Sequence, residues 1–199
     1  MSIGLLVGSL VSGLIGILAV RLYSRGRISR RTLLVGFAAA IASGLLYSPI
    51  HECGHAIFAV CLGGQIRSIG WSRVYYSHLP DGVRPWATAG GPLFPSGLAL
   101  VLVGVWFAIA KRCSDIGSVL LLMPSVIFLF CNMGTLFEYF EGGGHMAGLA
   151  SYYGMGRYGE LFLSAALVSC SLFVYMVIWL RCKSVKKTRG AAGPLDGIT

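Results

Sequence analysis

The chain has 199 residues, of which 56% are hydrophobic and only 12% are charged, and its mean hydropathy is +0.77. So little polar surface cannot coat a soluble globule, which excludes an ordinary soluble domain and predicts an integral membrane protein. The net charge of +9 does not indicate a nucleic-acid-binding protein, because the basic residues fall in short segments between apolar stretches.

Apolar stretches of about 20 residues can cross a bilayer as helices. Five such stretches follow one another along the chain, at residues 3–20, 33–62, 88–110, 117–136 and 161–180. The second is too long for one straight span, and Pro49 is expected to kink or restart its helix. We therefore predict an all-α, multi-pass membrane protein with about five transmembrane helices.

The expected organisation has four parts. A first transmembrane helix and a basic loop occupy residues 1–32, and a core of three transmembrane helices with a surface hairpin occupies residues 33–148. The final transmembrane helix follows in residues 149–182, and residues 183–199 are expected to form a basic, disordered tail.

The basic residues are distributed unevenly between the two sides of the membrane. With five spans, the basic residues in segments 21–31, 111–112 and 181–189 all lie on one side, and only Arg67, Arg73, Arg84 and Arg157 lie on the other. The positive-inside rule therefore predicts a cytoplasmic C-terminus and an N-terminus outside the cell or in a lumen. Anionic lipid headgroups are the expected partners of the basic loops.

The second apolar stretch carries the motif His51-Glu52-Cys53-Gly54-His55. Residues four apart lie on one face of a helix, so the imidazoles of His51 and His55 can bind one metal ion while Glu52 stands beside it. This pattern is typical of zinc hydrolases, in which the glutamate is the general base. Ionisable side chains are costly inside a membrane, which favours a functional site over a chance match.

A catalytic zinc site needs a third protein ligand beside an open position for water. Glu138 and Glu141 follow the fourth apolar stretch, on the side of the membrane where the histidine motif lies. His145 comes shortly afterwards, behind three glycines, and competes with them for this role. His78, between the second and third stretches, is a weaker candidate.

Residues 65–86 mix apolar and polar side chains around the turn sequence Pro80-Asp81-Gly82, which predicts a short β-hairpin or re-entrant loop at the membrane surface. Its aromatic residues, Trp71 and Tyr75 among them, can form an interfacial belt or lie beside an extended peptide that pairs with the hairpin edge. The third stretch opens with Gly90-Gly91-Pro92, a segment that permits close packing on the motif helix and is predicted to border the substrate.

These elements together resemble the site-2 protease family of intramembrane zinc metalloproteases, in particular its short forms without an added regulatory domain. The resemblance covers about residues 45–148 and is carried by His51-Glu52-Cys53-Gly54-His55-Ala56, the hairpin, Ala89-Gly90-Gly91-Pro92-Leu93 and the later acidic element before glycine. It implies a three-helix catalytic core that binds one Zn²⁺ per chain through His51 and His55, with Glu52 as general base and acid.

The chain departs from the family pattern at the third ligand. The family uses an aspartate followed by glycine, and the matching place here is Glu141-Gly142, so the resemblance implies Glu141 as the third ligand. The orientation also differs, because family sites usually open nearer the cytosol and the charge bias places this one toward the exterior or a lumen.

The expected function is hydrolysis of a peptide bond in a membrane-spanning or membrane-proximal protein substrate. The altered acidic element keeps a second class open, a non-proteolytic metal-binding scaffold or chaperone-like relative with an incomplete site. A membrane di-iron oxidase is disfavoured, because such a site needs a second Glu-x-x-His pair and the chain has only four histidines.

Overall fold

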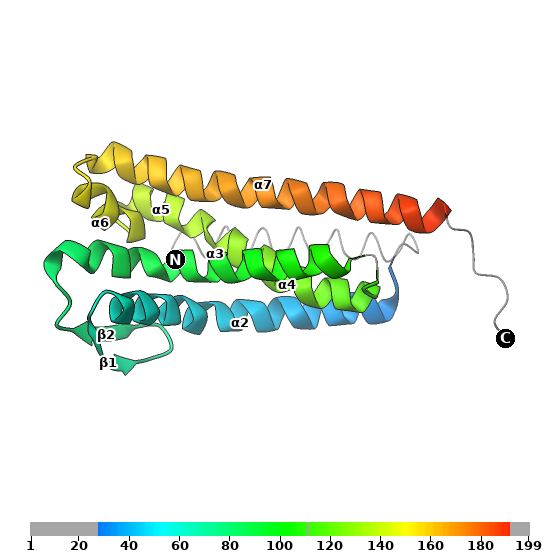
Figure 1. Cartoon of the computed structure of the whole chain (residues 1–199), viewed down its shortest axis with the longest axis horizontal. Helices are drawn as coiled ribbons and strands as arrows, with labels where there is room; N and C mark the ends of the chain where they lie inside the picture. Colours follow the sequence, from blue (N-terminus) through cyan, green and yellow to red (C-terminus); the bar gives the residue numbers. More distant parts are fainter. Residues whose placement is uncertain (1–27, 111, 192–199) are drawn as a thin grey trace.

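The computed structural model describes residues 28–110 and 112–191, which are mainly helical (Figure 1). Within them, four helical segments are long and apolar enough to cross a membrane: Arg30–Cys61, Asp81–Ile109, Asp115–Glu141 and Gly156–Cys182. They match the predicted second to fifth spans, and a small hairpin joins the first two of them. The chain is thus a helical membrane protein, as predicted; the predicted span at residues 3–20 lies outside the described residues.

Helix α2 (Arg30–Cys61) begins behind Ser29, whose hydroxyl oxygen accepts a hydrogen bond from the backbone N–H of Thr32 at 3.1 Å. The helix continues through Pro49, so the expected restart at this residue is wrong. A proline removes one backbone hydrogen bond, and a membrane helix tolerates the loss where neighbouring helices pack around it. The histidine motif therefore lies on the last third of one uninterrupted helix.

A two-stranded antiparallel hairpin follows, formed by β1 (Gln65–Ile69) and β2 (Val74–Ser77). Its tip is bound to α2, because the Ser48 hydroxyl donates a hydrogen bond to the carbonyl oxygen of Trp71 at 2.9 Å. At 1.5 Å per residue, Ser48 lies about 20 Å along α2 from the end of that helix. The predicted hairpin is therefore present, and it lies alongside α2 (Figure 1).

After the 3₁₀ turn η1 (Asp81–Val83), helix α3 (Arg84–Ile109) begins earlier than expected, with Pro85 in its first turn, where a missing N–H costs little. Its backbone approaches α2 closely at Gly90. A Cβ atom there would lie 2.8 Å from the Gly54 carbonyl oxygen and 2.6 Å from the Phe58 ring. Only glycine permits this approach, which places the Gly90-Gly91-Pro92 segment directly against the histidine motif.

Helices α4 (Asp115–Cys131) and α5 (Met133–Glu141) are separated by Asn132, which is only 1% exposed. The Asn132 amide oxygen accepts a hydrogen bond from Ser96 of α3 at 3.1 Å, and the amide nitrogen donates one to Ser171 at 2.9 Å. An unpaired amide would be costly in this apolar interior. The two hydrogen bonds therefore hold the junction of α4 and α5 against α3 on one side and against the helix that carries Ser171 on the other.

Two more helices complete the described chain, α6 (His145–Tyr152) and α7 (Gly156–Ala191). Residues 183–191, expected in a disordered tail, instead continue α7. Residues 192–199 lie outside the described residues. Figure 1 shows α6, the hairpin and the start of α7 gathered at one end of the bundle, away from the start of α2.

The close contact between α2 and α3 predicts a specific cost for adding a side chain at Gly54. A Gly54→Leu substitution would force the two helices apart, and we expect it to lower the free energy of unfolding by about 1–3 kcal/mol. Denaturation of the purified protein in mixed detergent micelles, followed by circular dichroism, measures this change.

Gly44, on the same helix, supplies the matched control, because a Cβ atom there would meet nothing within 4 Å. Gly44→Leu should change the stability by less than about 0.5 kcal/mol. Equal losses in both variants would contradict a specific role for the Gly54 contact.

Candidate metal centre

Three histidine side chains converge at the end of the bundle that carries the hairpin. The Nε2 atom of His51 lies 3.0 Å from Nε2 of His145 and 3.2 Å from Nε2 of His55. Candidate ligand atoms of all three lie within 4.8 Å of one another, and all three residues are partly buried. His51 and His55 come from α2, whereas His145 is the first residue of α6.

These separations fit one metal ion. Zinc–imidazole bonds measure about 2.0–2.1 Å, so two imidazole nitrogens in a tetrahedral shell lie about 3.3 Å apart. The contacts of 3.0 and 3.2 Å at His51 are close to that spacing. The group could therefore hold a metal ion.

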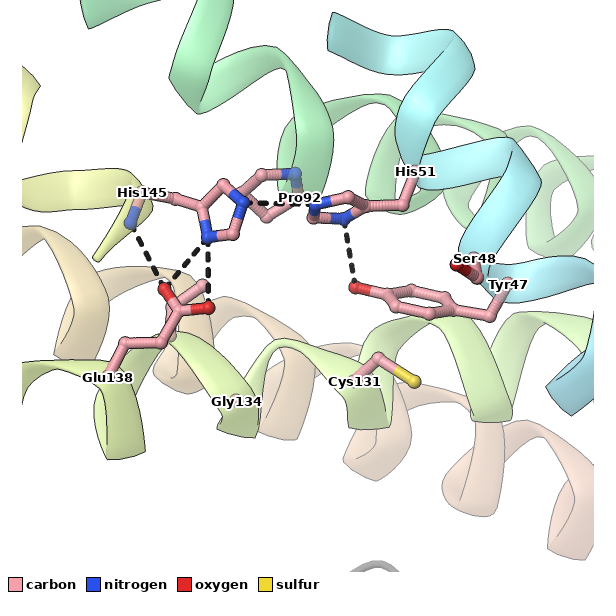
Figure 2. Close-up of a pocket in the computed structure, with 9 residues that line it drawn as sticks. Tyr47, Ser48, His51, Pro92, Cys131, Gly134, Glu138 and His145 are labelled. Carbon is pink, nitrogen blue, oxygen red and sulfur yellow. Dashed lines mark hydrogen bonds and ion pairs between the residues drawn. The ribbon is translucent and has the colours of Figure 1, made fainter. Parts of the chain in front are cut away.

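The other ring nitrogen of each histidine faces a polar group of the protein. Nδ1 of His55 lies 2.9 Å from the Ala87 carbonyl oxygen, and Nδ1 of His145 lies 2.8 Å from a carboxylate oxygen of Glu138. Carbonyl and carboxylate oxygens only accept hydrogen bonds, so both Nδ1 atoms carry the proton and both Nε2 atoms present lone pairs. Nδ1 of His51 lies 3.4 Å from the Tyr47 hydroxyl, which completes the outer layer (Figure 2).

This pattern of protonation favours a cation at the centre. The Nε2 atom of His51 contacts two other Nε2 atoms, and it carries at most one proton, so it cannot donate to both. A metal ion would use all three lone pairs together. Histidine ligands that hydrogen bond through the second ring nitrogen are the usual arrangement in protein metal sites.

Of the three candidates for the third ligand, only His145 lies beside His51 and His55 in the described part of the chain. Glu141 is exposed at the end of α5 and does not belong to the three-histidine group. The reason is the turn at Gly142, whose φ of 100° reverses the chain and returns His145 over Glu138. Glu138 contacts His145 instead of joining the group.

Gly91 of α3 leaves the space in which an ion would lie. A Cβ atom on this residue would lie 2.6 Å from Nε2 of His51 and would also meet the His55 ring. The neighbouring Gly90 packs on α2, and Pro92 lines a cavity beside the histidines. Gly90, Gly91 and Pro92, which were predicted to border the substrate, therefore have different neighbours: α2, the histidine rings and the cavity, respectively.

Glu52 lies next to His51 on α2 and is 8% exposed. Its carboxylate is near enough to His55 to interact with it electrostatically. Among the described residues, no hydrogen-bond partner from the protein is found for this carboxylate. It is thus available to accept a hydrogen bond.

A cavity of about 240 Å³ borders the centre and reaches from α2 to α5. Its wall includes His51 and His145 together with Tyr47, Ser48 and Thr135. At about 30 Å³ per molecule, this volume accommodates several waters. Because Ser48 also binds the hairpin tip, the cavity lies close to the backbone of Trp71.

The remaining candidates lie elsewhere. His78, exposed beyond the end of β2, does not belong to the three-histidine group, and Tyr75 lies on β2 with 55% of its surface exposed. Sequence reasoning missed Tyr47, although its position four residues before His51 on a helix is a usable signal. No sequence pattern indicated the Ala87 carbonyl.

Comparison with protein-family models, with curated proteins and with solved structures finds no match to this chain.

Loss of any one of the three histidines should remove the metal. We expect purified protein to contain zinc in a 1:1 ratio by mass spectrometry of the metal, and His51→Ala, His55→Ala and His145→Ala each to reduce it to near zero after dialysis. Two imidazoles alone bind zinc too weakly to survive that step. His78→Ala is the matched control and should keep the full zinc content; a loss there equal to the others would refute the three-histidine centre.

The space at Gly91 can be tested separately. Gly91→Ala places a methyl group against the ring nitrogens of His51 and His55, and we expect zinc affinity to fall at least about tenfold. Gly97→Ala, on the same helix in open space, should leave the affinity unchanged. Competition with a chromogenic chelator measures both, and equal affinities would contradict the proposed position of the ion.

Proposed function

We propose that this chain is an intramembrane zinc metalloprotease that hydrolyses a peptide bond in a membrane-spanning or membrane-proximal protein. The observation that carries the proposal is the convergence of three imidazole nitrogens near a buried glutamate: His51, Glu52 and His55 lie on a helix able to cross a membrane, and His145 starts the short helix α6. A stability role explains such a group poorly, because polar and ionisable side chains at membrane depth are costly.

In this proposal His51, His55 and His145 bind one Zn²⁺ and leave a fourth position open. Zinc held by these residues would supply Lewis acidity, which would polarise a scissile carbonyl and make water a nucleophile at neutral pH. Three neutral imidazoles with an open position form a donor set known from catalytic zinc sites. The complete set favours an enzyme over a relative with an incomplete site.

Glu52 is the general base. Its carboxylate, free of hydrogen bonds to the described protein residues and buried beside the histidines, takes a proton from the attacking water and passes it to the leaving amine. The cavity beside His51 and His145 supplies the water, which lipid cannot provide. Tyr47 and the Ala87 carbonyl hold two of the imidazoles in place while this occurs.

The hairpin is the proposed substrate-binding surface. A peptide can be cut only where it leaves the helical conformation, and an extended peptide can pair with the free edge of a short sheet. The hairpin tip is tied to α2 beside the cavity, and Ile69, Trp71 and Tyr75 there are more than half exposed. An apolar stretch of a membrane protein is the substrate that such a surface favours.

The proposal agrees with the resemblance to short site-2 proteases in its motif helix, hairpin and glycine-rich third element, and it differs at the third ligand. His145 takes the place for which the family pattern suggested Glu141. The charge bias orients the centre toward the exterior or a lumen, with the basic loops beside anionic cytoplasmic lipids.

Glu52→Gln separates metal binding from catalysis. The variant should retain one zinc ion per chain, because Glu52 is not a ligand, and should cleave at least about 100-fold more slowly, because the proton acceptor is gone. The assay reconstitutes the protein in vesicles with a library of single-span peptides and detects products by mass spectrometry. Chelation of zinc should stop cleavage by the wild type, and added zinc should restore it.

Retained cleavage in Glu52→Gln would refute the mechanism. Full zinc content in the wild type without any zinc-dependent product would favour the alternative, a metal-binding membrane scaffold.

A further inference from the structure

The hydrogen bonds that His145 makes with Glu138 differ from those of the other two histidines. The Glu138 carboxylate accepts from Nδ1 of His145 at 2.8 and 2.9 Å and also from the backbone N–H of His145 at 3.0 Å. The Nδ1 atoms of the other two histidines face neutral groups, the Ala87 carbonyl and the Tyr47 hydroxyl. His145 is thus the single member of the group whose Nδ1 atom faces a group with a formal negative charge.

The backbone around this pair is shaped to bring the two residues together. Gly142 reverses the chain after α5, and a Cβ atom on Gly144 would collide with the Glu138 carboxylate. Gly144 precedes α6 and has no side chain to cap that helix, so Glu138 caps its first N–H. A carboxylate from one helix thereby fixes both the backbone and the ring of the residue that begins the next.

We infer that Glu138 is the positioning residue that makes His145 the third metal ligand. It holds the proton on Nδ1, directs Nε2 toward His51 and offsets part of the charge of a divalent ion bound by three neutral imidazoles. This inference rests on the proposed metal centre and adds to it a residue that binds no metal itself.

The charge argument follows from where the pair lies. Glu138 and His145 are both partly buried, with 31% and 23% of their side-chain surfaces exposed. A dication without a nearby negative group is costly in such surroundings. A carboxylate one imidazole away lowers that cost, and carboxylate–histidine–zinc arrangements raise the basicity of the ligand nitrogen.

The geometry of α5 supports the same role. Asn132, at the start of this helix, is held by Ser96 of α3 and Ser171 of α7. Glu138 is less than two turns further along α5. The carboxylate is therefore delivered from a helix that is anchored independently of the histidines.

The experiment compares zinc affinity in Glu138→Gln and Glu138→Ala with the full-length wild type in detergent, by chelator competition. Two donors of His145 converge on Glu138, and glutamine offers only one acceptor oxygen for them. We expect about tenfold weaker binding with glutamine and up to about 100-fold weaker binding with alanine. Glu141→Gln is the matched control, an exposed carboxylate on the same helix that should leave the affinity unchanged.

A second measurement separates positioning from simple destabilisation. The absorption bands of Co²⁺-loaded protein report the ligand set, and we expect Glu138→Gln to keep the wild-type bands at saturating metal while Glu138→Ala loses the third nitrogen. The melting temperatures of the metal-free variants should agree with that of the metal-free wild type.

Unchanged zinc affinity in Glu138→Ala would overturn the inference, as would an equal loss in Glu141→Gln. Equal destabilisation of the metal-free variants, with wild-type cobalt spectra in both, would overturn it in favour of a cap for α6 alone. A wild-type protein that binds zinc through the three histidines but cleaves nothing would refute the proposed protease and leave the role of Glu138 standing.

Discussion

The close contact between α2 and α3 determines where every other part of the centre can lie. With no side chains at Gly54 and Gly90, the two backbones approach until the Gly90 position touches Phe58 and the Gly54 carbonyl. The same approach brings the Ala87 carbonyl to His55 and Gly91 against both rings of α2. In a membrane, where burial of apolar surface does little to bring helices together, small residues at such a contact supply the attraction through close packing.

The second constraint is that polar groups at membrane depth must be satisfied within the protein. The amide of Asn132 is satisfied by hydrogen bonds to both α3 and α7, and these bonds fix the position at which α5 begins. Glu138 meets the same constraint by accepting from two donors of His145, the backbone N–H and Nδ1. Structure and proposed chemistry thus depend on the same interactions, because the bonds that compensate buried polar atoms also orient the imidazoles.

Most of the membrane topology was readable from hydropathy, since long apolar stretches have few alternatives to spanning helices. The pair of His51 and His55 was equally predictable from the sequence, because helical periodicity alone puts residues four apart on one face.

The third member of the three-histidine group could not be predicted in this way. Distance along the chain predicted that Glu138, Glu141 and His145 share one side of the membrane, but the choice among them depends on the direction of the chain after Gly142. That direction is set by a left-handed glycine and by the bonds between Glu138 and His145, which are tertiary features. The start of α3 was missed, and the restart considered at Pro49 is absent, for a related reason, because packing overrides local signals for helix ends.

The position of His145 on a separate short helix has a consequence for how the centre assembles. His51 and His55 are held by one continuous helix and are oriented as soon as α2 and α3 pack together. His145 reaches them only when α6 has folded back at the glycines 142–144. Glycine has no side chain to restrict its backbone dihedral angles, so these residues do not favour the folded-back position by themselves. In the proposed centre, metal binding and docking of α6 would therefore be coupled equilibria. An ion that prefers three nitrogens to two would stabilise the folded-back helix by the same free energy by which the docked helix would strengthen binding of the ion. Glu138 contacts both the backbone N–H and the ring of His145, so in the docked helix it orients the third imidazole toward His51.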